Sequence, residues 1–125
     1  MIAEEDTFLG CEVDHVISEK HGGPTEADNL ANACVFCNRA KGSDIASINW
    51  QSEAIVRFFN PRTDRWAEHF ELVEDRIEGR TVIGIVTARI FEFNSAERAL
   101  ERQILRAIQR YPTEAAARRI WPVLP

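Results

Sequence analysis

Residues 11–42 read CEVDHVISEKHGGPTEADNLANACVFCNRAKG, and this stretch decides the fold. Residues 8–18 alternate loosely and are rich in β-forming side chains, which predicts a strand or the arm of a short hairpin. Residues 19–29 hold two glycines, a proline and two Asx residues, a composition typical of a loop. Residues 30–37 form a short apolar run, and residues 37–42 predict a brief helix that stops at its glycine. The expected order is strand, Gly-rich loop, short strand and helix.

The rest of the chain, residues 43–125, predicts a mixture of strands and helices. A turn is expected at NPRTD (60–64). The alternation of WAEHFELVED (66–75) predicts a strand, followed by a turn at residues 78–79. Residues 81–94 are ambiguous, because their β-branched side chains suit a strand while their flanking residues suit helix caps, and we expect a helix.

Capping residues mark three helices in the C-terminal half. Thr81 and Asn94 suit the N-cap and the C-cap of the first. Ser95 suits the N-cap of an amphipathic second helix over 95–111, which a proline ends, and Thr113 suits the N-cap of a short third one. The apolar face expected on the second helix comprises Leu100, Ile104, Ile108 and Tyr111. The side chains expected to pack against residues 11–42, together with that face, are Phe58, Phe59, Trp66, Phe70, Ile83, Ile90 and Phe91.

Composition bounds the class of protein. The chain has 125 residues, of which 45% are hydrophobic and 28% charged, so a disordered chain is excluded. The chain contains no apolar run long enough to span a bilayer, and it does not begin like an export signal. Its three cysteines cannot all pair with one another in disulfides. We therefore expect a cytoplasmic protein with no membrane partner. The net charge of −5 argues against bulk electrostatic coating of nucleic acid, but not against an enzyme that grips a few phosphates.

The chemistry-bearing residues of 11–42 follow one another in a recognisable order. An Asp14-His15 pair precedes a Gly-Gly loop, an Asn29-Leu30 pair, and then Cys-x-x-Cys-Asn-x-x-Lys over 34–41. This arrangement resembles the HNH endonucleases, whose active site is a ββα-metal (His-Me) finger. The stretch NPRTDRWAEHF (60–70) also looks like the continuation found in many bacterial HNH proteins.

The resemblance implies a fold and a division of the chain. We expect one α+β HNH nuclease domain over 1–125, with a catalytic finger at 11–42 (strand, Gly-rich loop, short strand, helix) buttressed by a scaffold of strands and C-terminal helices at 43–125. These two names, finger and scaffold, are used for the two segments below.

The resemblance also implies a reaction, the metal-dependent hydrolysis of DNA, most naturally double-stranded, with a 5′ phosphate and a 3′ oxygen leaving group. His15 is the expected general base, and an imidazole is well suited to that task near neutral pH. Asp14 and Asn38 are expected to hold a single Mg²⁺ or Mn²⁺, which prefer oxygen ligands. Asn29 is expected to pin the loop that orients His15. Because neighbouring strand residues point to opposite faces, Asp14 and His15 meet at one centre only if the strand twists or ends there.

Lys41 belongs to the expected catalytic set with His15 and Asn29, and Arg39 is a candidate of lower rank. Both are expected to contact scissile or flanking phosphates. His21 in the loop and His69 in the scaffold are the remaining histidines of the chain. On the second predicted helix, Arg102, Arg106 and Arg110 suit either a DNA-backbone contact or an ordinary solvated face laced with Glu–Arg pairs.

The cysteines depart from the family pattern. Many HNH proteins bind a structural Zn²⁺ with two Cys-x-x-Cys pairs, whereas here Cys34 and Cys37 form one partial zinc half-site and the upstream pair is missing. Cys11 is a poor third ligand. We expect no zinc, and the alternatives are other ligands, a second subunit or a longer natural N-terminus.

Two other functions remain open from the sequence alone. One is an HNH-fold module that binds nucleic acid or a protein without catalysis, favoured by the acidic charge and the missing cysteine pair. The other is a zinc-knuckle interaction domain. A homodimer would suit cleavage of both strands.

Overall fold

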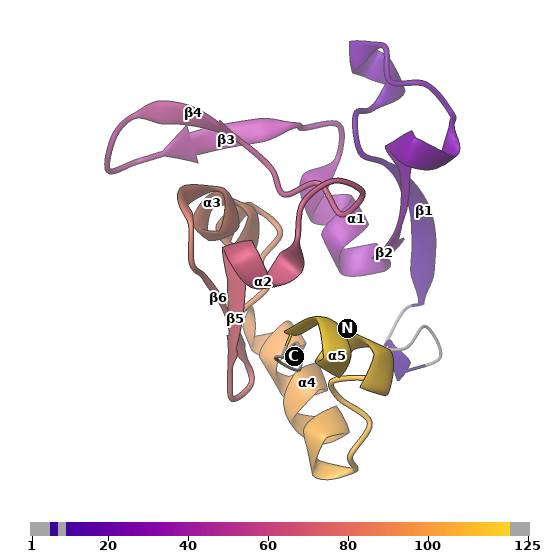
Figure 1. Ribbon diagram of the computed structural model, residues 1–125, viewed down its shortest axis with the longest axis vertical. Coiled ribbons are helices and arrows are strands. Elements are labelled where there is room, and N and C mark those ends of the chain that lie inside the picture. Colours follow the sequence, from indigo (N-terminus) through magenta and orange to yellow (C-terminus); the bar gives the residue numbers. More distant parts are fainter. Residues whose placement is uncertain (1–5, 8–9, 121–125) are drawn as a thin grey trace, which may run out of the picture.

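The computed structural model describes residues 6–7 and 10–120. Within them the protein is α+β, with three separate two-stranded antiparallel sheets and five α-helices (Figure 1), which confirms the predicted fold class. The elements in chain order are β1 (Cys11–His15), the 3-10 turns η2 (Glu19–His21) and η3 (Ala27–Asn29), β2 (Leu30–Cys34), α1 (Val35–Lys41), β3 (Ala46–Asn49), β4 (Ala54–Arg57), α2 (Trp66–His69), β5 (Phe70–Val73), β6 (Arg76–Gly79), α3 (Val82–Ile90), α4 (Ala96–Ala107) and α5 (Glu114–Ile120).

The finger has the expected order of elements. Strands β1 and β2 pair antiparallel, with His15 opposite Leu30, and α1 follows directly. The helix begins at Val35, before the predicted start at residue 37, because the Cys34 side chain already serves as its N-cap. Gly23 is required in the loop, since a Cβ at this position would overlap the carbonyl oxygen of Ile17.

The strand predicted over 66–75 is only partly present. Its first four residues form the helical turn α2, and the strand β5 starts at Phe70, which is 1% exposed and the best buried aromatic side chain among the described residues. The turn lies between β5 and β6, where Glu74 has φ +55°, and not at residues 78–79. Gly79 belongs to β6, and a Cβ there would overlap the backbone of α3. This glycine therefore marks a close strand–helix approach rather than a turn.

The helix predicted over 81–94 is confirmed, although it is shorter. Thr81 caps α3 by accepting a hydrogen bond from the Gly84 N–H, as expected. Asn94 is not the C-cap, because α3 ends at Ile90. Its side-chain amide instead bonds the backbone N–H and carbonyl of Ile77, which ties the segment after α3 to β6.

The helix predicted over 95–111 is also shorter, and its buried face is the opposite of the predicted one. Ser95 caps α4, but the helix ends at Ala107. The buried residues of α4 are Arg98, Glu101, Arg102 and Leu105, while Leu100, Ile104 and Ile108 are about half exposed. Of the predicted apolar face only Tyr111, beyond the helix end, is buried. The polar face turns inward because its guanidinium groups find partners there, such as the Asp75 carbonyl that accepts from Arg102 Nε at 2.6 Å.

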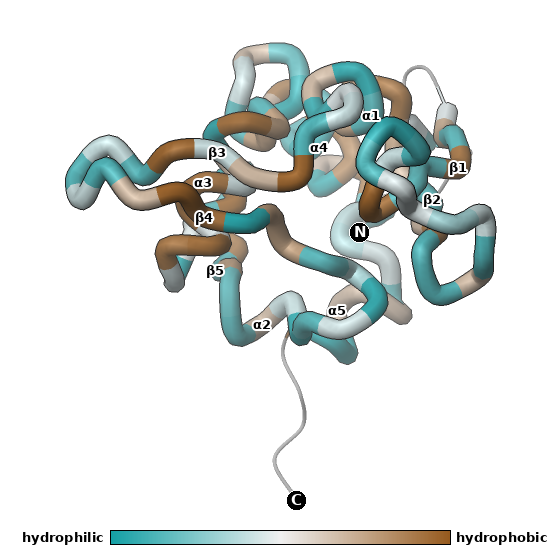
Figure 2. The backbone as a smooth tube through the Cα atoms, turned by 90° about the horizontal axis from the view of Figure 1, so that it is seen from above, coloured by the Kyte–Doolittle hydropathy of each residue, from teal (hydrophilic) through white to brown (hydrophobic). Residues whose placement is uncertain are grey.

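The core of the scaffold is aromatic, and it includes five of the side chains that were expected to pack against the finger. Rings contact one another in a chain that comprises Phe58, Phe59, Trp66, Phe70, Phe91 and Phe93. Figure 2 shows hydrophobic stretches of β3, β4 and α3 lying together, and Arg89 of α3 donates to the Ile48 carbonyl of β3. Thr113 bonds the Ala116 N–H at the start of α5, in agreement with the third predicted cap.

Candidate active site

His15 is held by a short chain of hydrogen bonds on the loop side of β1. Its Nε2 lies 2.9 Å from Thr25 Oγ1, and that hydroxyl donates to Glu19 Oε1 at 3.3 Å. A hydroxyl has one hydrogen, and since it is used on Glu19, Thr25 accepts a hydrogen bond from His15 Nε2–H. Glu19 Oε1 also lies 3.6 Å from Nε2. The arrangement assigns the proton of the neutral imidazole to Nε2 and leaves Nδ1 with its lone pair and no bonding partner among the described residues.

Asn29 fixes the loop that follows His15. Its side-chain oxygen accepts from the Ile17 N–H, and its Nδ2 donates to the carbonyls of Ile17 and Pro24, all within 2.8–2.9 Å. The side chain is buried, with 7% of the residue exposed. These bonds agree with the loop-pinning position expected of Asn29 from the sequence.

Asp14 points the other way, toward α1. Its Oδ2 lies 3.1 Å from Lys41 Nζ, and the same ammonium donates to the backbone carbonyl of His15 at 2.7 Å. Lys41 is buried, with a side chain 6% exposed. The Lys41 charge is thus used inside the finger on Asp14, and this pairing argues against the expected contact with a phosphate.

Asn38 is engaged by a different carboxylate. Its Nδ2 donates to Glu12 Oε2 at 2.7 Å, and its own side-chain oxygen takes no bond among the described residues. Glu12 and Asp14 are two residues apart on β1, so both face α1, while His15 faces the loop. The predicted convergence of Asp14, Asn38 and His15 on one point is thus not preformed.

The residues on the α1 side of β1 nevertheless suit a hard cation by their chemistry. Two carboxylates and the uncommitted amide oxygen of Asn38 lie on facing elements. Such oxygen donors are those that Mg²⁺ and Mn²⁺ prefer. No group of three or more His, Cys, Asp or Glu side chains within the described residues has a metal-binding arrangement. The donor set therefore fits a divalent ion in kind, with Glu12 as a donor that sequence reasoning missed.

Cys34 and Cys37 form a thiol pair at the start of α1. The Cys37 N–H donates to Cys34 Sγ at 3.4 Å. Hydrogen bonding from the Cys37 thiol lowers the pKa of Cys34 to about 6, and it raises the pKa of Cys37, which burial raises further. Cys11 lies opposite Cys34 in the hairpin, and no disulfide joins the three. Cys34 is thus poised to be a thiolate near neutral pH.

The lower-ranked candidates lie in different surroundings. His21 is exposed in η2 and Arg39 is exposed on α1, and neither side chain has a bonding partner within the described part of the chain. His69 is not brought to the finger, because its Nδ1 lies 2.6 Å from Thr81 Oγ1 and its ring packs on Phe59.

The three arginines of the predicted DNA-contacting face are committed to the scaffold or to the N-terminal segment. Arg102 is 2% exposed and bonds the carbonyls of Asp75 and Phe93. Arg106 pairs with the Asp75 carboxylate, and Arg110 pairs with Asp6. The DNA-backbone role is wrong for Arg102, which is buried, and the paired state of the other two favours the alternative that the sequence left open.

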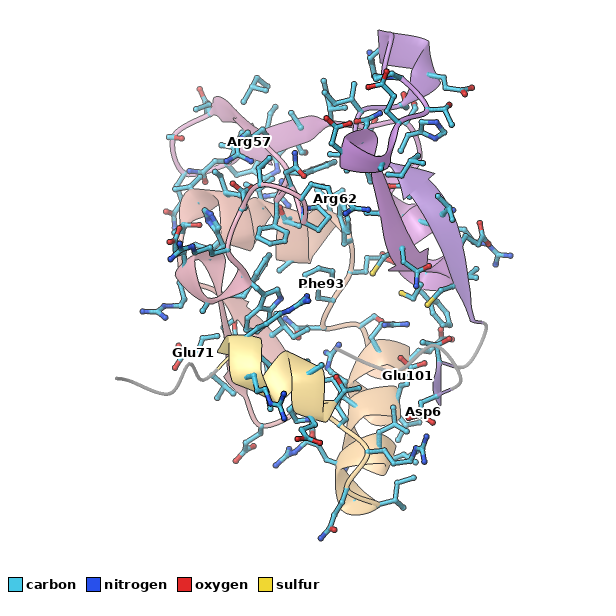
Figure 3. The ribbon with its side chains drawn as sticks, turned by 45° about the vertical axis from the view of Figure 1, so that its right-hand side comes forward. Asp6, Arg57, Arg62, Glu71, Phe93 and Glu101 are labelled. Atoms are coloured by element: carbon cyan, nitrogen blue, oxygen red, sulfur yellow. The ribbon has the colours of Figure 1, made fainter. Side chains whose placement is uncertain are left out.

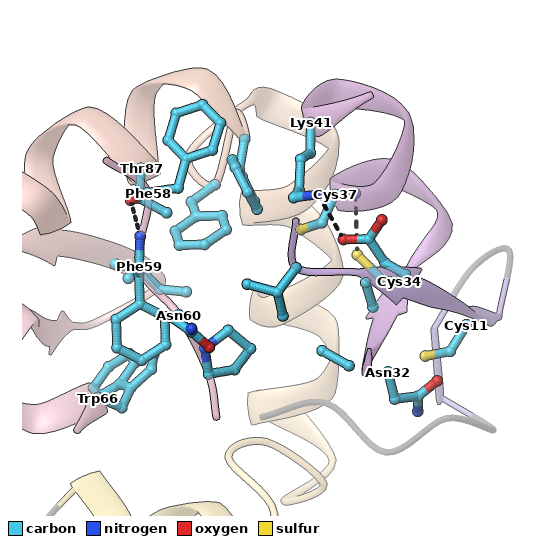
Figure 4. A pocket seen from close by; sticks show the side chains of 18 of the residues that line it. Cys11, Asn32, Cys34, Cys37, Lys41, Phe58, Phe59, Asn60, Trp66 and Thr87 are labelled. Atoms are coloured by element: carbon cyan, nitrogen blue, oxygen red, sulfur yellow. Dashed lines mark hydrogen bonds and ion pairs between the residues drawn. The ribbon is translucent and has the colours of Figure 1, made fainter. Parts of the chain in front are cut away.

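A cavity of about 560 Å³ separates the finger from the scaffold. Asp14 is one of the finger residues that line it. Lys41 and Cys34 line the same wall, and Phe59 and Trp66 line the opposite wall (Figure 4). The Asp14 carboxylate is therefore reached from this cavity, whereas His15 is reached from the loop side of β1.

The comparison with protein families supports the resemblance. Residues 4–44 match the family model of the HNH endonuclease, which confirms the resemblance stated from the sequence over about one third of the chain. The match indicates a nuclease-type domain in this segment. Searches of curated proteins and of solved structures give no match. Among the described residues, none of the helices combines the length and apolarity that a membrane span requires.

Proposed function

We propose that this chain is a divalent-metal-dependent endonuclease of the HNH type, which hydrolyses phosphodiester bonds of DNA with His15 as general base. The observation that carries the proposal is the fixed orientation of the His15 imidazole: Nε2 is bonded to Thr25, and Nδ1 is left as an acceptor with no bonding partner among the described residues. The family match over residues 4–44 supports the same reaction class.

The residues of the chain then have separate tasks. Nδ1 of His15 takes the proton of the attacking water, and the resulting imidazolium keeps its Nε2–H on Thr25. The carboxylate of Glu19, 3.6 Å from Nε2, stabilises the positive charge that develops on the ring. Asn29 keeps the loop that carries Thr25 and Glu19 in register with His15. Proton abstraction by a positioned base is worth about 10²–10⁴ in rate.

Asp14 and Asn38 would hold Mg²⁺ or Mn²⁺, which would supply positive charge for the transition state and the leaving oxygen when bound. Asp14 is paired with Lys41, so a divalent ion and the ammonium compete for the same carboxylate. Lys41 thereby compensates a half-buried negative charge inside the finger.

The proposal is tested by incubating supercoiled plasmid with the protein and Mg²⁺ or Mn²⁺. We expect nicked or linear product from wild type and a loss of at least about 10²-fold in rate for His15→Ala. His21→Ala is the matched control, because His21 is an exposed histidine of the loop whose side chain has no bonding partner among the described residues. Equal activity of wild type and His15→Ala would refute the assignment.

A second candidate function is a nucleic-acid-binding module of the HNH fold without catalysis. The pairing of Asp14 with Lys41 and of Asn38 with Glu12 favours it, because both proposed metal ligands already have partners in the chain. Binding of DNA without cleavage under either ion would select this candidate.

A further inference from the structure

Arg62 is a scaffold residue that is fixed to the finger. Its Nε donates to the backbone carbonyl of Leu30 at 2.6 Å, across 32 positions of sequence. Leu30 is the cross-strand partner of His15 in the β1–β2 hairpin. The other two guanidinium nitrogens of Arg62 have no bonding partner within the described residues, and the side chain is exposed. Figure 3 shows Arg62 on the side of the scaffold that faces β2.

The loop that carries Arg62 is rigidly built. The Asp64 carboxylate accepts both guanidinium N–H groups of Arg57, at 2.7 and 3.0 Å, and also the Asn60 N–H. The Asn60 side-chain oxygen accepts the Arg62 N–H at 2.9 Å. One hydrogen-bond network thus joins four residues of this loop: Arg57, Asn60, Arg62 and Asp64. The network fixes the loop backbone and leaves the Arg62 side chain exposed. This preorganisation lowers the entropy cost of binding an anion there.

The cation that a phosphate needs beside His15 is not supplied by the residue predicted from the sequence. The Lys41 ammonium is buried and paired with the Asp14 carboxylate, and the Arg57 guanidinium is paired with the Asp64 carboxylate. Nε of Arg62 is hydrogen-bonded to the Leu30 carbonyl, and the two terminal guanidinium nitrogens are left available. Two parallel N–H groups of a guanidinium match the spacing of two phosphate oxygens. Since hydrogen-bonded strands are about 4.8 Å apart, the Arg62 head lies on the order of 10 Å from β1, a separation that reaches a neighbouring phosphate rather than the scissile one.

We propose that Arg62 binds a backbone phosphate flanking the bond that His15 attacks, and so sets the register of the nucleic acid strand on the finger. This inference rests on the proposed function for the identity of the ligand. It explains why a residue of the scaffold is bonded to the hairpin at the position opposite His15. A phosphate contact of this kind positions the strand without reading its sequence.

The test measures binding in the absence of cleavage. A fluorescent DNA duplex is titrated with protein in EDTA, and anisotropy is recorded over a range of salt concentrations. For Arg62→Ala we expect affinity about tenfold weaker, and a slope of log affinity against log salt that is smaller in magnitude by about 1. Arg62→Lys keeps the charge but replaces the guanidinium fork by a single ammonium nitrogen, which cannot bond two phosphate oxygens in the same planar geometry, so its affinity should be intermediate.

Arg65→Ala is the matched control. Arg65 is an exposed arginine three residues further on, its side chain has no bonding partner among the described residues, and its removal changes the net charge equally. We expect its salt slope to equal that of wild type. Equal slopes for Arg62→Ala and wild type, or equal losses for Arg62→Ala and Arg65→Ala, would overturn the inference. Unfolding temperatures of all variants are compared first, and Arg62→Lys is decisive if the alanine variant fails to fold.

The outcomes separate this inference from the proposed function. If wild type nicks plasmid while Arg62→Ala binds DNA as wild type does, the inference fails and the nuclease proposal stands. If wild type binds DNA with the expected effect of Arg62→Ala but never nicks it, the nuclease proposal fails and the phosphate contact stands.

Discussion

Replacing Lys41 by methionine tests the internal charge pair of the finger. The ammonium lies 3.1 Å from Asp14 Oδ2 and 2.7 Å from the His15 carbonyl, and its side chain is 6% exposed. Removing one partner of a buried pair costs about 3–5 kcal/mol, and an unpaired carbonyl costs about 1 kcal/mol more. The Asp14 side chain is 15% exposed, so water relieves part of this. We expect Lys41→Met to lose about 3 kcal/mol in the free energy of unfolding.

The assay is urea unfolding followed by tryptophan fluorescence. A loss of about 3 kcal/mol corresponds to a midpoint lower by roughly 10 °C in a thermal scan. The double variant Lys41→Met with Asp14→Asn removes the uncompensated charge as well, so it should recover at least about 1 kcal/mol. Arg39→Met, an exposed change on the same helix, should stay within about 0.5 kcal/mol of wild type. A Lys41→Met variant no less stable than Arg39→Met would refute the reasoning.

Three further predictions concern the loop and the thiol pair. Asn29→Ala removes three hydrogen bonds from a buried amide, and we expect a loss of about 2–3 kcal/mol by urea unfolding; a loss below about 0.5 kcal/mol would contradict the loop-pinning position. Gly23→Ala forces a Cβ onto the Ile17 carbonyl and should lower the unfolding midpoint, whereas an unchanged midpoint would show that the loop has another conformation. Because the pKa of Cys34 is about 6, its alkylation by iodoacetamide, followed by mass spectrometry, should rise through pH 6 and level off by pH 8. In Cys37→Ala the rise should move to higher pH, and an unmoved profile would exclude the Cys37 thiol as the cause.

The finger could be predicted because its signals are local. The glycines and Asx residues of the loop, and the glycine after α1, act within a few residues of themselves. The register then follows from pairing the two short strands, with His15 opposite Leu30. Strand alternation also foresaw the difficulty that Asp14 and His15 point apart, and the structure has them on opposite faces.

The contacts between segments could not be predicted. The apolar spacing of α4 favoured Leu100 and Ile104 as buried, but the carbonyl of Asp75 and the loop after α3 draw Arg102 inward instead. A one-dimensional pattern does not contain the positions of such distant acceptors. For the same reason Lys41 looked like a phosphate ligand, since its partner Asp14 is 27 residues away and meets it only when α1 packs on β1.

Residues of the candidate site were missed where their signal is not in a motif. Thr25 and Glu19 are ordinary loop residues in the sequence, and only the fold brings them to His15 Nε2. Glu12 had a weak signal, because its position two residues before Asp14 places both side chains on one face of β1.

The central claim is that His15 Nδ1 accepts the proton of the attacking water, and chemical rescue tests it most directly. Single-turnover cleavage of a DNA duplex is measured with Mg²⁺ or Mn²⁺ for wild type and His15→Ala, each with and without added imidazole. We expect imidazole to restore a concentration-dependent part of the rate lost in His15→Ala and to leave the rate of wild type unchanged. Cleavage by His15→Ala at the wild-type rate without imidazole would contradict it.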